Sequence, residues 1–357
     1  MSLLLPDDGR FGSGPSKVRP AQIAAIADSG LMGTSHRKPA VRGAVRSIQE
    51  GLSDLFGLPE GYEAILGNGG ASALWDAISF CLVEDRAQAA VIGEFSGKAA
   101  RAVERAPFLG EPEVLRVEPG QMVECRPADV DTYLYAHNET STGATTPLRR
   151  VAPGSGALTV VDGTSIAGGL KIDPADADFY YFSPQKCFGA DGGLWLAFAS
   201  PAALERIERL TAERWVPDFL NLQLAVNNSR KAQTLNTPAI ATLLMLQAQV
   251  EWMVEAGGLS TMQARSRDNS SAVYEWAEAR PFATPFIAPE YRSPVVCTID
   301  FAGVDAAGIA AQLRELGVVD VEPYRSLGRN QLRIATFPAI DVEDVTRLLG
   351  VIDELVG

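Results

Sequence analysis

Residues 160–165 read VVDGTS and residues 181–186 read YFSPQK, and these two stretches decide the fold that we expect for this chain. In each stretch an apolar run that is typical of a buried strand leads to a lone charged side chain, Asp162 in one and Lys186 in the other. Open α/β sheets bind ligands at the carboxyl ends of their strands. A carboxylate and an amine at that edge are what pyridoxal phosphate needs from a protein, because its ring nitrogen takes an acidic partner and its aldehyde takes a lysine.

Other apolar runs along the chain indicate the sheet to which these two strands belong. They occupy residues 89–92, 132–136, 158–161, 179–182 and 194–198. The runs are continuously apolar, as expected for strands that are buried on both faces of a mostly parallel sheet. Helical patterns interleave with them at residues 40–56, 71–83, 97–105, 201–210 and 239–256. This alternation predicts an α/β fold whose large domain has three layers.

The chain divides into three predicted parts. Residues 1–20 are rich in Gly, Pro and Ser and predict an irregular arm. Residues 21–257 form the large, cofactor-binding domain. Residues 258–357 carry a strand, helix, strand, helix pattern, which predicts a smaller α+β domain. We place the boundary at the glycine pair 257–258 and the polar run that follows at residues 265–271.

Composition narrows the class of protein. Hydrophobic residues make up 46% and charged residues 21%, as is ordinary for a globular enzyme. The net charge of −13 argues against a nucleic-acid partner, because polyanions bind basic surfaces. The cysteines show no metal-ligand spacing, so we expect no metal site. The first residues lack the pattern of a secretion signal, and no apolar stretch approaches the roughly 18 residues of a membrane span. We therefore expect no membrane association and a cytoplasmic location.

A third stretch, GNGGAS at residues 67–72, predicts a phosphate site. Its glycine turn opens directly into a helical pattern, where free backbone N–H groups and the positive helix end attract anions, and the Ser72 hydroxyl can add a contact. Simpler explanations exist for all three features. The turn can be only a turn, Lys186 can be a strand-end residue that reaches to water, and Asp162 can be a helix cap.

A series of short motifs extends the pattern over most of the chain. They lie at residues 35–37 (SHR), 69–72 (GGAS), 138–140 (NET), 162–165 (DGTS), 185–186 (QK), 236–238 (NTP) and 332–335 (LRIA). In this order they resemble the phosphoserine aminotransferases, a pyridoxal-phosphate family of the class V, fold-type I group. The resemblance runs from about Phe11 to the last residue.

The resemblance implies roles for the residues around the cofactor ring. Lys186 would bind the cofactor covalently and move the substrate proton, and Asp162 would keep the ring nitrogen protonated. Thr140 and Gln185 would face the phenolic oxygen and its surroundings. Phe95 would stack on the ring, at a position where many members of the family have tryptophan.

The cofactor phosphate would be bound from two chains. Ala71 and Ser72 would contact it by backbone and hydroxyl. Asn236 and Thr237 would reach it from the neighbouring subunit, so the resemblance implies a homodimer with active sites shared across the interface.

The substrate would be held by basic side chains. His36 and Arg37 would bind its distal phosphate with help from Arg329, and Arg333 would bind its α-carboxylate. Residue 328 is glycine where some members carry histidine, so one phosphate contact differs. The alternatives are a structural role for His36, surface ion pairs for Arg37 and Arg329, and a strand-edge charge for Arg333.

The resemblance implies amino transfer between L-glutamate and 3-phosphohydroxypyruvate, a phosphorylated keto acid, to give O-phospho-L-serine in serine biosynthesis. The 4-phosphohydroxythreonine pair of pyridoxine biosynthesis is a second expected substrate. One alternative is a cysteine desulfurase-like lyase, which would need a mobile cysteine, whereas Cys297 lies in an apolar run. Others are an alanine- or serine–glyoxylate aminotransferase, which would not need the distal anion pocket, and a dimeric scaffold without activity.

Overall fold

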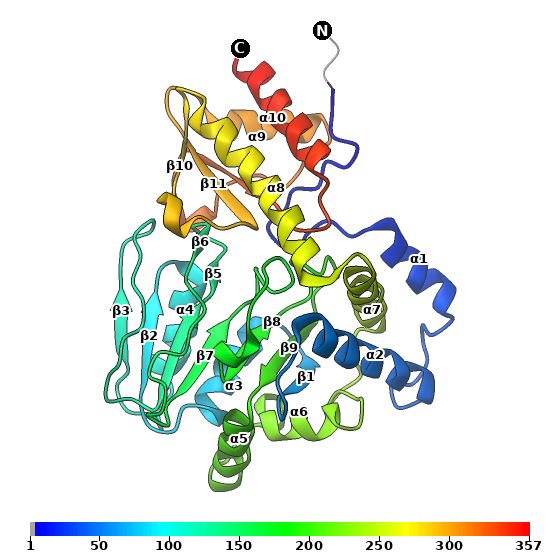
Figure 1. Cartoon of the computed structure of the whole chain (residues 1–357), viewed down its shortest axis with the longest axis vertical. Coiled ribbons are helices and arrows are strands. Elements are labelled where there is room, and N and C mark those ends of the chain that lie inside the picture. The colour runs from blue at the N-terminus through cyan, green and yellow to red at the C-terminus, as the bar shows by residue number, and fades with distance from the viewer. Residues whose placement is uncertain (1–3) are drawn as a thin grey trace.

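The centre of the molecule is a seven-stranded sheet (Figure 1). The computed structural model describes residues 4–357, so the first three positions of the predicted arm lie outside the described residues. Across the sheet the strands run in the order β1 (Glu63–Asn68), β9 (Leu194–Ala199), β8 (Phe179–Phe182), β7 (Leu158–Asp162), β4 (Thr132–Ala136), β2 (Ala87–Val91) and β3 (Glu113–Arg116). β9 runs antiparallel to both of its neighbours, and the pairs from β8 to β3 are parallel. The predicted mostly parallel sheet is confirmed.

Helices cover both faces of this sheet and make the three predicted layers (Figure 1). One face carries α2 (Pro39–Phe56) and α7 (Ile240–Glu255), with α1 (Pro20–Ser29) packed against α7. The other face carries α3 (Ala71–Cys81), α4 (Glu94–Glu104), α5 (Pro201–Glu213) and α6 (Leu222–Ser229). Each helical pattern predicted in this domain corresponds to one of these helices, whereas α1 and α6 were not predicted.

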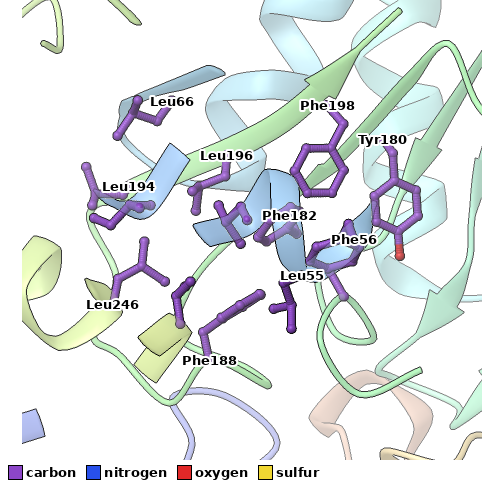
Figure 2. Close-up of a cluster of buried hydrophobic side chains, with 14 of the residues drawn as sticks. Leu55, Phe56, Leu66, Tyr180, Phe182, Phe188, Leu194, Leu196, Phe198 and Leu246 are labelled. Atoms are coloured by element: carbon purple, nitrogen blue, oxygen red, sulfur yellow. The ribbon is translucent and has the colours of Figure 1, made fainter. Parts of the chain in front are cut away.

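The five central strands, β9, β8, β7, β4 and β2, are buried along their whole length, whereas the edge strands β1 and β3 are partly exposed. In β8, Tyr180 and Phe182 point into the core beneath α2 and α7, and Phe179 and Tyr181 point into the core beneath α3 to α6. Figure 2 shows the first of these cores, where Phe182 and Phe198 pack against Phe56, with ring centroids 6.1 and 4.8 Å from it. A strand that faces two cores cannot alternate with polar residues.

The smaller domain is built on a second, antiparallel sheet. Its strands are β10 (Ala283–Pro285), β11 (Val296–Phe301) and β12 (Gln331–Ala335), and α8 (Gly258–Glu278), α9 (Ala306–Glu315) and α10 (Val342–Val356) pack on it. A two-stranded ribbon, β5 (Asn138–Glu139) with β6 (Ala144–Thr145), lies between the two sheets (Figure 1). Short 3-10 turns lie at Pro174–Asp176, Asp218–Leu220, Pro289–Tyr291 and Arg325–Leu327. Within residues 4–357, no helix combines the length and apolarity that a bilayer span requires.

The polar run at residues 265–271, which we placed at the domain boundary, does not interrupt the secondary structure. It lies inside α8, which continues unbroken to Glu278. Its polar side chains bind the turn ahead of α10: Arg265 Nε donates to the carbonyl oxygen of Pro338 at 2.7 Å, and Asn269 Nδ2 donates to that of Ile340 at 3.0 Å. The break in the chain is at Gly257, whose φ of +107° ends α7. The division at residues 257 and 258 stays a prediction.

The described part of the arm is irregular, as predicted, but it is firmly packed. Phe11 is fully buried in the core of the smaller domain. Lys17 is buried among carboxylates, with its Nζ 3.7 Å from Asp8, 3.5 Å from Asp341 and 3.6 Å from Asp344. The arm therefore links the smaller domain to the loop that follows β8, where Ser16 bonds to Gln185 and Lys186.

Candidate active site

Lys186 lies in the loop after β8, at the carboxyl end of that strand, and its side chain is partly buried. Nζ donates a hydrogen bond to the carbonyl oxygen of Ser13 at 2.5 Å. Burial, and next the positive charge of Arg333, lower the pKa of Lys186 to about 8, while the charge of Asp162 opposes this shift. The amine therefore becomes a neutral nucleophile much closer to neutral pH than an exposed lysine does.

Asp162 is the last residue of β7, the neighbouring strand, and pairs in register with Tyr181 of β8. Its carboxylate accepts hydrogen bonds from Trp75 Nε1 at 3.3 Å and from the backbone N–H of Thr164 at 2.9 Å. Burial raises the pKa of Asp162, and these hydrogen bonds oppose the shift. A cationic ring N–H beside Asp162 would stabilise its ionised form.

The arm passes directly over Lys186, and the sequence analysis did not foresee this. Ser16 Oγ donates to the carbonyl oxygen of Lys186 at 2.5 Å, and its N–H donates to that of Gln185 at 3.1 Å. Gly14 has a φ of +132°, and a Cβ there would lie 2.2 Å from Lys186 Nζ. A clustering of glycine, serine and proline at residues 12–15 is the only sequence signal of this close approach.

The predicted phosphate site is the start of α3. Gly70 precedes the helix and supplies no side-chain cap. The N–H of Ala71 donates to Ser183 Oγ at 3.0 Å, and Ser72 is exposed. The first turn of α3 therefore offers backbone N–H groups, a hydroxyl and the positive helix end to an anion.

Asn236 and Thr237 lie beside the same turn of their own chain. The N–H of Asn236 donates to Asn68 Oδ1 at 3.1 Å, and Asn68 Nδ2 donates to the carbonyl oxygen of Thr237 at 3.3 Å. Both side chains are exposed. Their position next to the glycine turn fits a role at a phosphate, and their exposure leaves them accessible to a second chain.

Several predicted residues gather around Lys186. The ring centroid of Phe95, near the start of α4, lies 5.9 Å from Lys186 Nζ. Arg333 of β12 donates from Nη1 to the carbonyl oxygen of Thr140 at 3.2 Å. Tyr324, which the sequence analysis missed, stands between the two: its ring lies 5.4 Å from that of Phe95 and 5.4 Å from the Arg333 guanidinium. The two domains therefore meet at this site.

Four polar groups near Lys186 are buried and have no hydrogen-bond partner among residues 4–357. They are Ser13 Oγ, Thr164 Oγ1, Gln185 Oε1 and Arg333 Nε. Buried polar groups in proteins are nearly always paired, so this set indicates room for a polar ligand. Together with the amine, the carboxylate and the α3 turn, these groups fit pyridoxal phosphate.

Other predicted substrate residues are not brought to Lys186. His36 and Arg37 lie between α1 and α2; the ring of His36 is buried, with Nε2 unpaired, and Arg37 is exposed. This surface adjoins the segment that leads to Asn236, because Arg42 Nε donates to the carbonyl oxygen of Lys231 at 3.0 Å. No contact within residues 4–357 joins His36 or Arg37 to Lys186.

Arg329 has a different neighbourhood from the one expected. Its guanidinium forms a two-point ion pair with Asp300 and lies 4.5 Å from the ring centroid of Phe286. The side chain is 43% exposed. The ion pair that the sequence analysis gave as the alternative is therefore present, and Arg329 would have to leave Asp300 to bind substrate.

A small apolar cavity of about 20 Å³ lies behind the site, between the sheet and the helices α3 and α4. Trp75, Asp162 and Tyr181 line its end, and neither Lys186 nor Arg333 does. The cavity therefore lies behind the residues that would bind a substrate.

The cysteine desulfurase-like alternative finds no support, because Cys297 is buried in β11 and burial raises the pKa of its thiol to about 12.

Comparisons with known proteins agree with this geometry. Residues 116–321 match the family described as Aminotransferase class-V. A phosphoserine aminotransferase from Corynebacterium glutamicum (strain R) is 57% identical over 358 residues, which cover 99% of this chain and 95% of that protein.

Solved structures share the fold. The PLP-bound phosphoserine aminotransferase from Trichomonas vaginalis has a TM-score of 0.85 at 22% identity and covers 97% of this chain, which covers 99% of it. An alanine–glyoxylate aminotransferase from Nostoc sp. has a TM-score of 0.84 at 20% identity, with coverage of 100% and 97%. Enzymes with different substrates thus have this fold, so the fold alone does not select a substrate.

Proposed function

The chain belongs to the phosphoserine aminotransferase family of the class-V aminotransferases and is a transaminase, and we propose that it transfers the amino group of L-glutamate to 3-phosphohydroxypyruvate with pyridoxal 5′-phosphate as cofactor. One observation carries the proposal: the partly buried amine of Lys186 and the buried carboxylate of Asp162 lie at the carboxyl ends of adjacent strands, with Arg333 beside them. The products are O-phospho-L-serine and 2-oxoglutarate.

The residues around Lys186 would hold the cofactor and move the proton. Bound pyridoxal phosphate supplies an electron sink that weakens the Cα–H bond of the amino acid. Asp162 would pair with the ring nitrogen, and Phe95 would pack on the ring face. Lys186 would anchor the cofactor and, when the substrate amine takes its place, would accept the Cα proton and return it. Its lowered pKa lets the neutral amine act as a base near neutral pH.

The α-carboxylate of either substrate would bind Arg333. This guanidinium is fixed through Nη1 to Thr140, and its Nε is buried and unpaired. Charge-assisted hydrogen bonds from arginine to a carboxylate are among the stronger polar contacts. The hydroxyl of Ser13, which is also buried and unpaired, is available to the same ligand.

The distal phosphate would be bound across a homodimer. His36 and Arg37 make no contact with the Lys186 site of their own chain within the described residues, and α2, which follows them, is joined to the segment ahead of Asn236 and Thr237 by the bond from Arg42 to Lys231. A second chain placed against this region would receive all four side chains at its cofactor phosphate and its distal anion pocket. The same pocket would accept the 4-phosphohydroxythreonine pair of pyridoxine biosynthesis. A cytoplasmic location fits the four unpaired cysteines, since disulfides form in oxidising compartments.

A substrate panel tests the proposal. The purified protein is loaded with pyridoxal phosphate and given glutamate with hydroxypyruvate, with 3-phosphohydroxypyruvate or with glyoxylate, and 2-oxoglutarate is measured. We expect a kcat/KM for the phosphorylated keto acid at least about tenfold above the other two, because a charged contact contributes about 1.5–3 kcal/mol. Equal efficiency with hydroxypyruvate would refute the substrate assignment, and preference for glyoxylate would support the alanine–glyoxylate alternative.

A further inference from the structure

We propose that Glu139 is a positioning residue that sets the place of the Phe95 ring in the active site by capping the first turn of α4 from a different segment of the chain. The inference rests on the proposed role of Phe95 at the cofactor ring. Glu139 itself lies in the β5–β6 ribbon and is fully buried.

The Glu139 carboxylate is saturated with hydrogen bonds. Oε1 accepts from the backbone N–H of Phe95 at 3.2 Å and from the N–H and hydroxyl of Ser141 at 3.2 and 2.6 Å. Oε2 accepts from the backbone N–H of Ser96 at 2.9 Å and from its hydroxyl at 2.8 Å. All of these partners are N–H or O–H groups, so the site is built for an acceptor with two oxygens.

This arrangement replaces an ordinary helix cap. Gly93 stands at the N-cap of α4 and has no side chain to accept from the first turn. A Cβ at Gly93 would lie 2.5 Å from Glu139 Cγ, so glycine leaves the space through which the carboxylate reaches the helix. A negative charge at this end also interacts favourably with the helix dipole.

The cap acts on the site because the capped residue is Phe95. The backbone N–H that Glu139 binds belongs to the residue whose ring lies 5.9 Å from Lys186 Nζ. The next residue along the chain, Thr140, supplies the carbonyl oxygen that fixes Arg333 at 3.2 Å. One buried carboxylate therefore fixes the ring-stacking residue and adjoins the anchor of the carboxylate-binding arginine.

Glu139→Gln is the most specific substitution, because it keeps the shape of the side chain and replaces one acceptor oxygen with an NH₂ group. A serine hydroxyl could accept from the new NH₂ group, but on either side that group would also face a backbone N–H, of Phe95 or of Ser96, and the first turn of α4 would have to move away from it. Phe95 would shift with that turn. Aromatic pairs contribute modestly beyond the area they bury, so we expect the dissociation constant for pyridoxal phosphate to rise about two- to tenfold.

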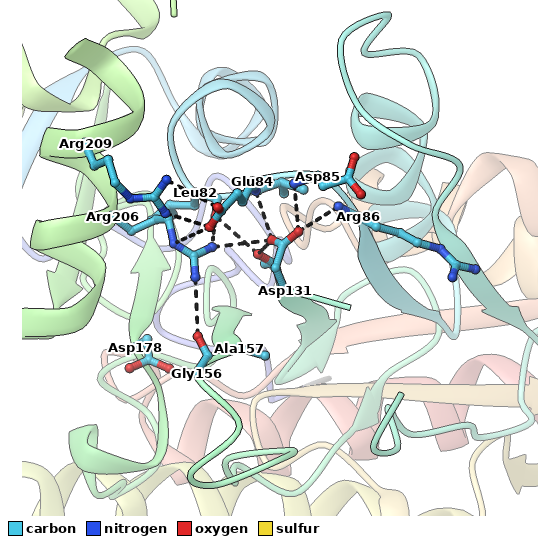
Figure 3. Close-up of polar contacts among 12 residues, drawn as sticks. Leu82, Glu84, Asp85, Arg86, Asp131, Gly156, Ala157, Asp178, Arg206 and Arg209 are labelled. Atoms are coloured by element: carbon cyan, nitrogen blue, oxygen red, sulfur yellow. Dashed lines mark hydrogen bonds and ion pairs between the residues drawn. The ribbon is translucent and has the colours of Figure 1, made fainter. Parts of the chain in front are cut away.

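Asp131 supplies a matched control: it lies directly ahead of β4, whereas Glu139 lies beyond the other end of that strand, in β5. Its carboxylate also binds backbone, accepting from the N–H groups of Glu84 at 2.9 Å and of Asp85 and Arg86 at 2.7 Å each (Figure 3). Asp131→Asn should lower thermal stability as Glu139→Gln does. It should leave cofactor binding unchanged, because it holds no residue of the site.

The experiment measures two properties of the bound cofactor besides turnover: its visible circular dichroism and its dissociation constant by equilibrium dialysis. Glu139→Gln should change both, and Asp131→Asn neither. In a Phe95→Leu background, Glu139→Gln should add less than about twofold to the dissociation constant, since the ring through which it acts is gone. If Glu139→Gln does not fold, Ser141→Ala removes one bond to the same carboxylate and should shift both readouts less, in the same direction.

Wild-type values for Glu139→Gln, or an undiminished effect of it without the Phe95 ring, would overturn the inference. Failure of the wild-type protein to bind pyridoxal phosphate would instead overturn the proposed function, so the two failures are distinguishable.

Discussion

The pKa of Lys186 makes a direct prediction at the scale of a single residue. An amine attacks an aldehyde only in its neutral form, and burial together with Arg333 brings the pKa of Lys186 to about 8. In protein freed of cofactor, the rate of covalent attachment of pyridoxal phosphate should therefore rise with pH and reach half of its plateau near pH 8. Stopped-flow absorbance measures this rate.

The same shift affects folding stability. Because the pKa of Lys186 is lower in the folded than in the unfolded state, the unfolded chain binds more protons between about pH 8 and pH 10.5. The contribution of Lys186 to the free energy of unfolding should therefore increase with pH between about pH 8 and pH 10.5. The Lys186→Met variant should not show this increase. For the first experiment, a rate of pyridoxal phosphate attachment whose midpoint lies near pH 10.5 would show that the amine of Lys186 is exposed to water, contrary to the structure.

Two arginines should separate the two ends of the substrate. Arg37→Ala should lower kcat/KM for the phosphorylated keto acid about ten- to a hundredfold without changing the spectrum of the bound cofactor, because a charge-assisted hydrogen bond is lost only at the distal phosphate. Arg333→Ala should lower kcat/KM for every substrate, since all carry an α-carboxylate. Steady-state kinetics of both variants on hydroxypyruvate and its phosphate give the comparison. A loss that is equal for the two keto acids in Arg37→Ala would contradict the distal role.

Charged residues at the ends of apolar runs could be predicted from the sequence. Asp162 ends one run that is typical of a buried strand and Lys186 lies shortly after another, so we expected both at one edge of the sheet. Ser13 and Tyr324 could not be found this way, because they lie in irregular segments with no periodicity. The contact of Lys186 with Ser13 spans 173 positions, and that of Arg333 with Thr140 spans 193. Contacts between residues so far apart in the chain leave no pattern among neighbouring residues from which they could be predicted.

At the scale of elements, the arm can be tested through Gly14. Alanine there is strained by the φ of +132° and would place Cβ 2.2 Å from Lys186 Nζ, so Gly14→Ala should release the cofactor and abolish most turnover. Gly30→Ala is the control, since Gly30 also has a positive φ, +62°, but a Cβ added there would meet nothing within 4 Å. Dialysis followed by absorbance measures cofactor retention. Equal retention in the two variants would contradict the close approach of the arm.

Secondary structure could be predicted where the sequence pattern has one common structural cause, and could not be predicted where the same pattern has two. Five of the seven strands of the large sheet were predicted because they are continuously apolar, and the edge strands β1 and β3, which are not, were missed. Apolarity carries no direction, so the antiparallel course of β9 could not be predicted from it. The polar run at residues 265–271 had the composition of a linker. Its side chains are polar because Arg265 and Asn269 bind backbone carbonyl groups ahead of α10, at separations of 73 and 71 positions along the chain.

At the scale of the whole molecule, the shared site can be tested by mixing subunits. Lys186→Ala should be inactive because it lacks the amine, and Thr237→Glu should be inactive because a carboxylate would repel the cofactor phosphate. Unfolding and refolding the two together should give heterodimers in which one site has both intact residues, with up to about half of the wild-type activity per heterodimer. Activity that stays absent after mass spectrometry has confirmed subunit exchange would show that Thr237 acts in its own chain.

The packing of the arm also determines when the site can form during synthesis. Phe11 is buried in a core with β11 and β12, and Lys17 forms an ion pair with Asp344. These arm residues are synthesised early, but the residues that they contact are synthesised near the end of the chain. Ser13 reaches Lys186 only as part of that arm. A nascent chain that has completed the large sheet still lacks both Arg333 and the packed arm, so we expect it to bind the cofactor only when translation is nearly finished.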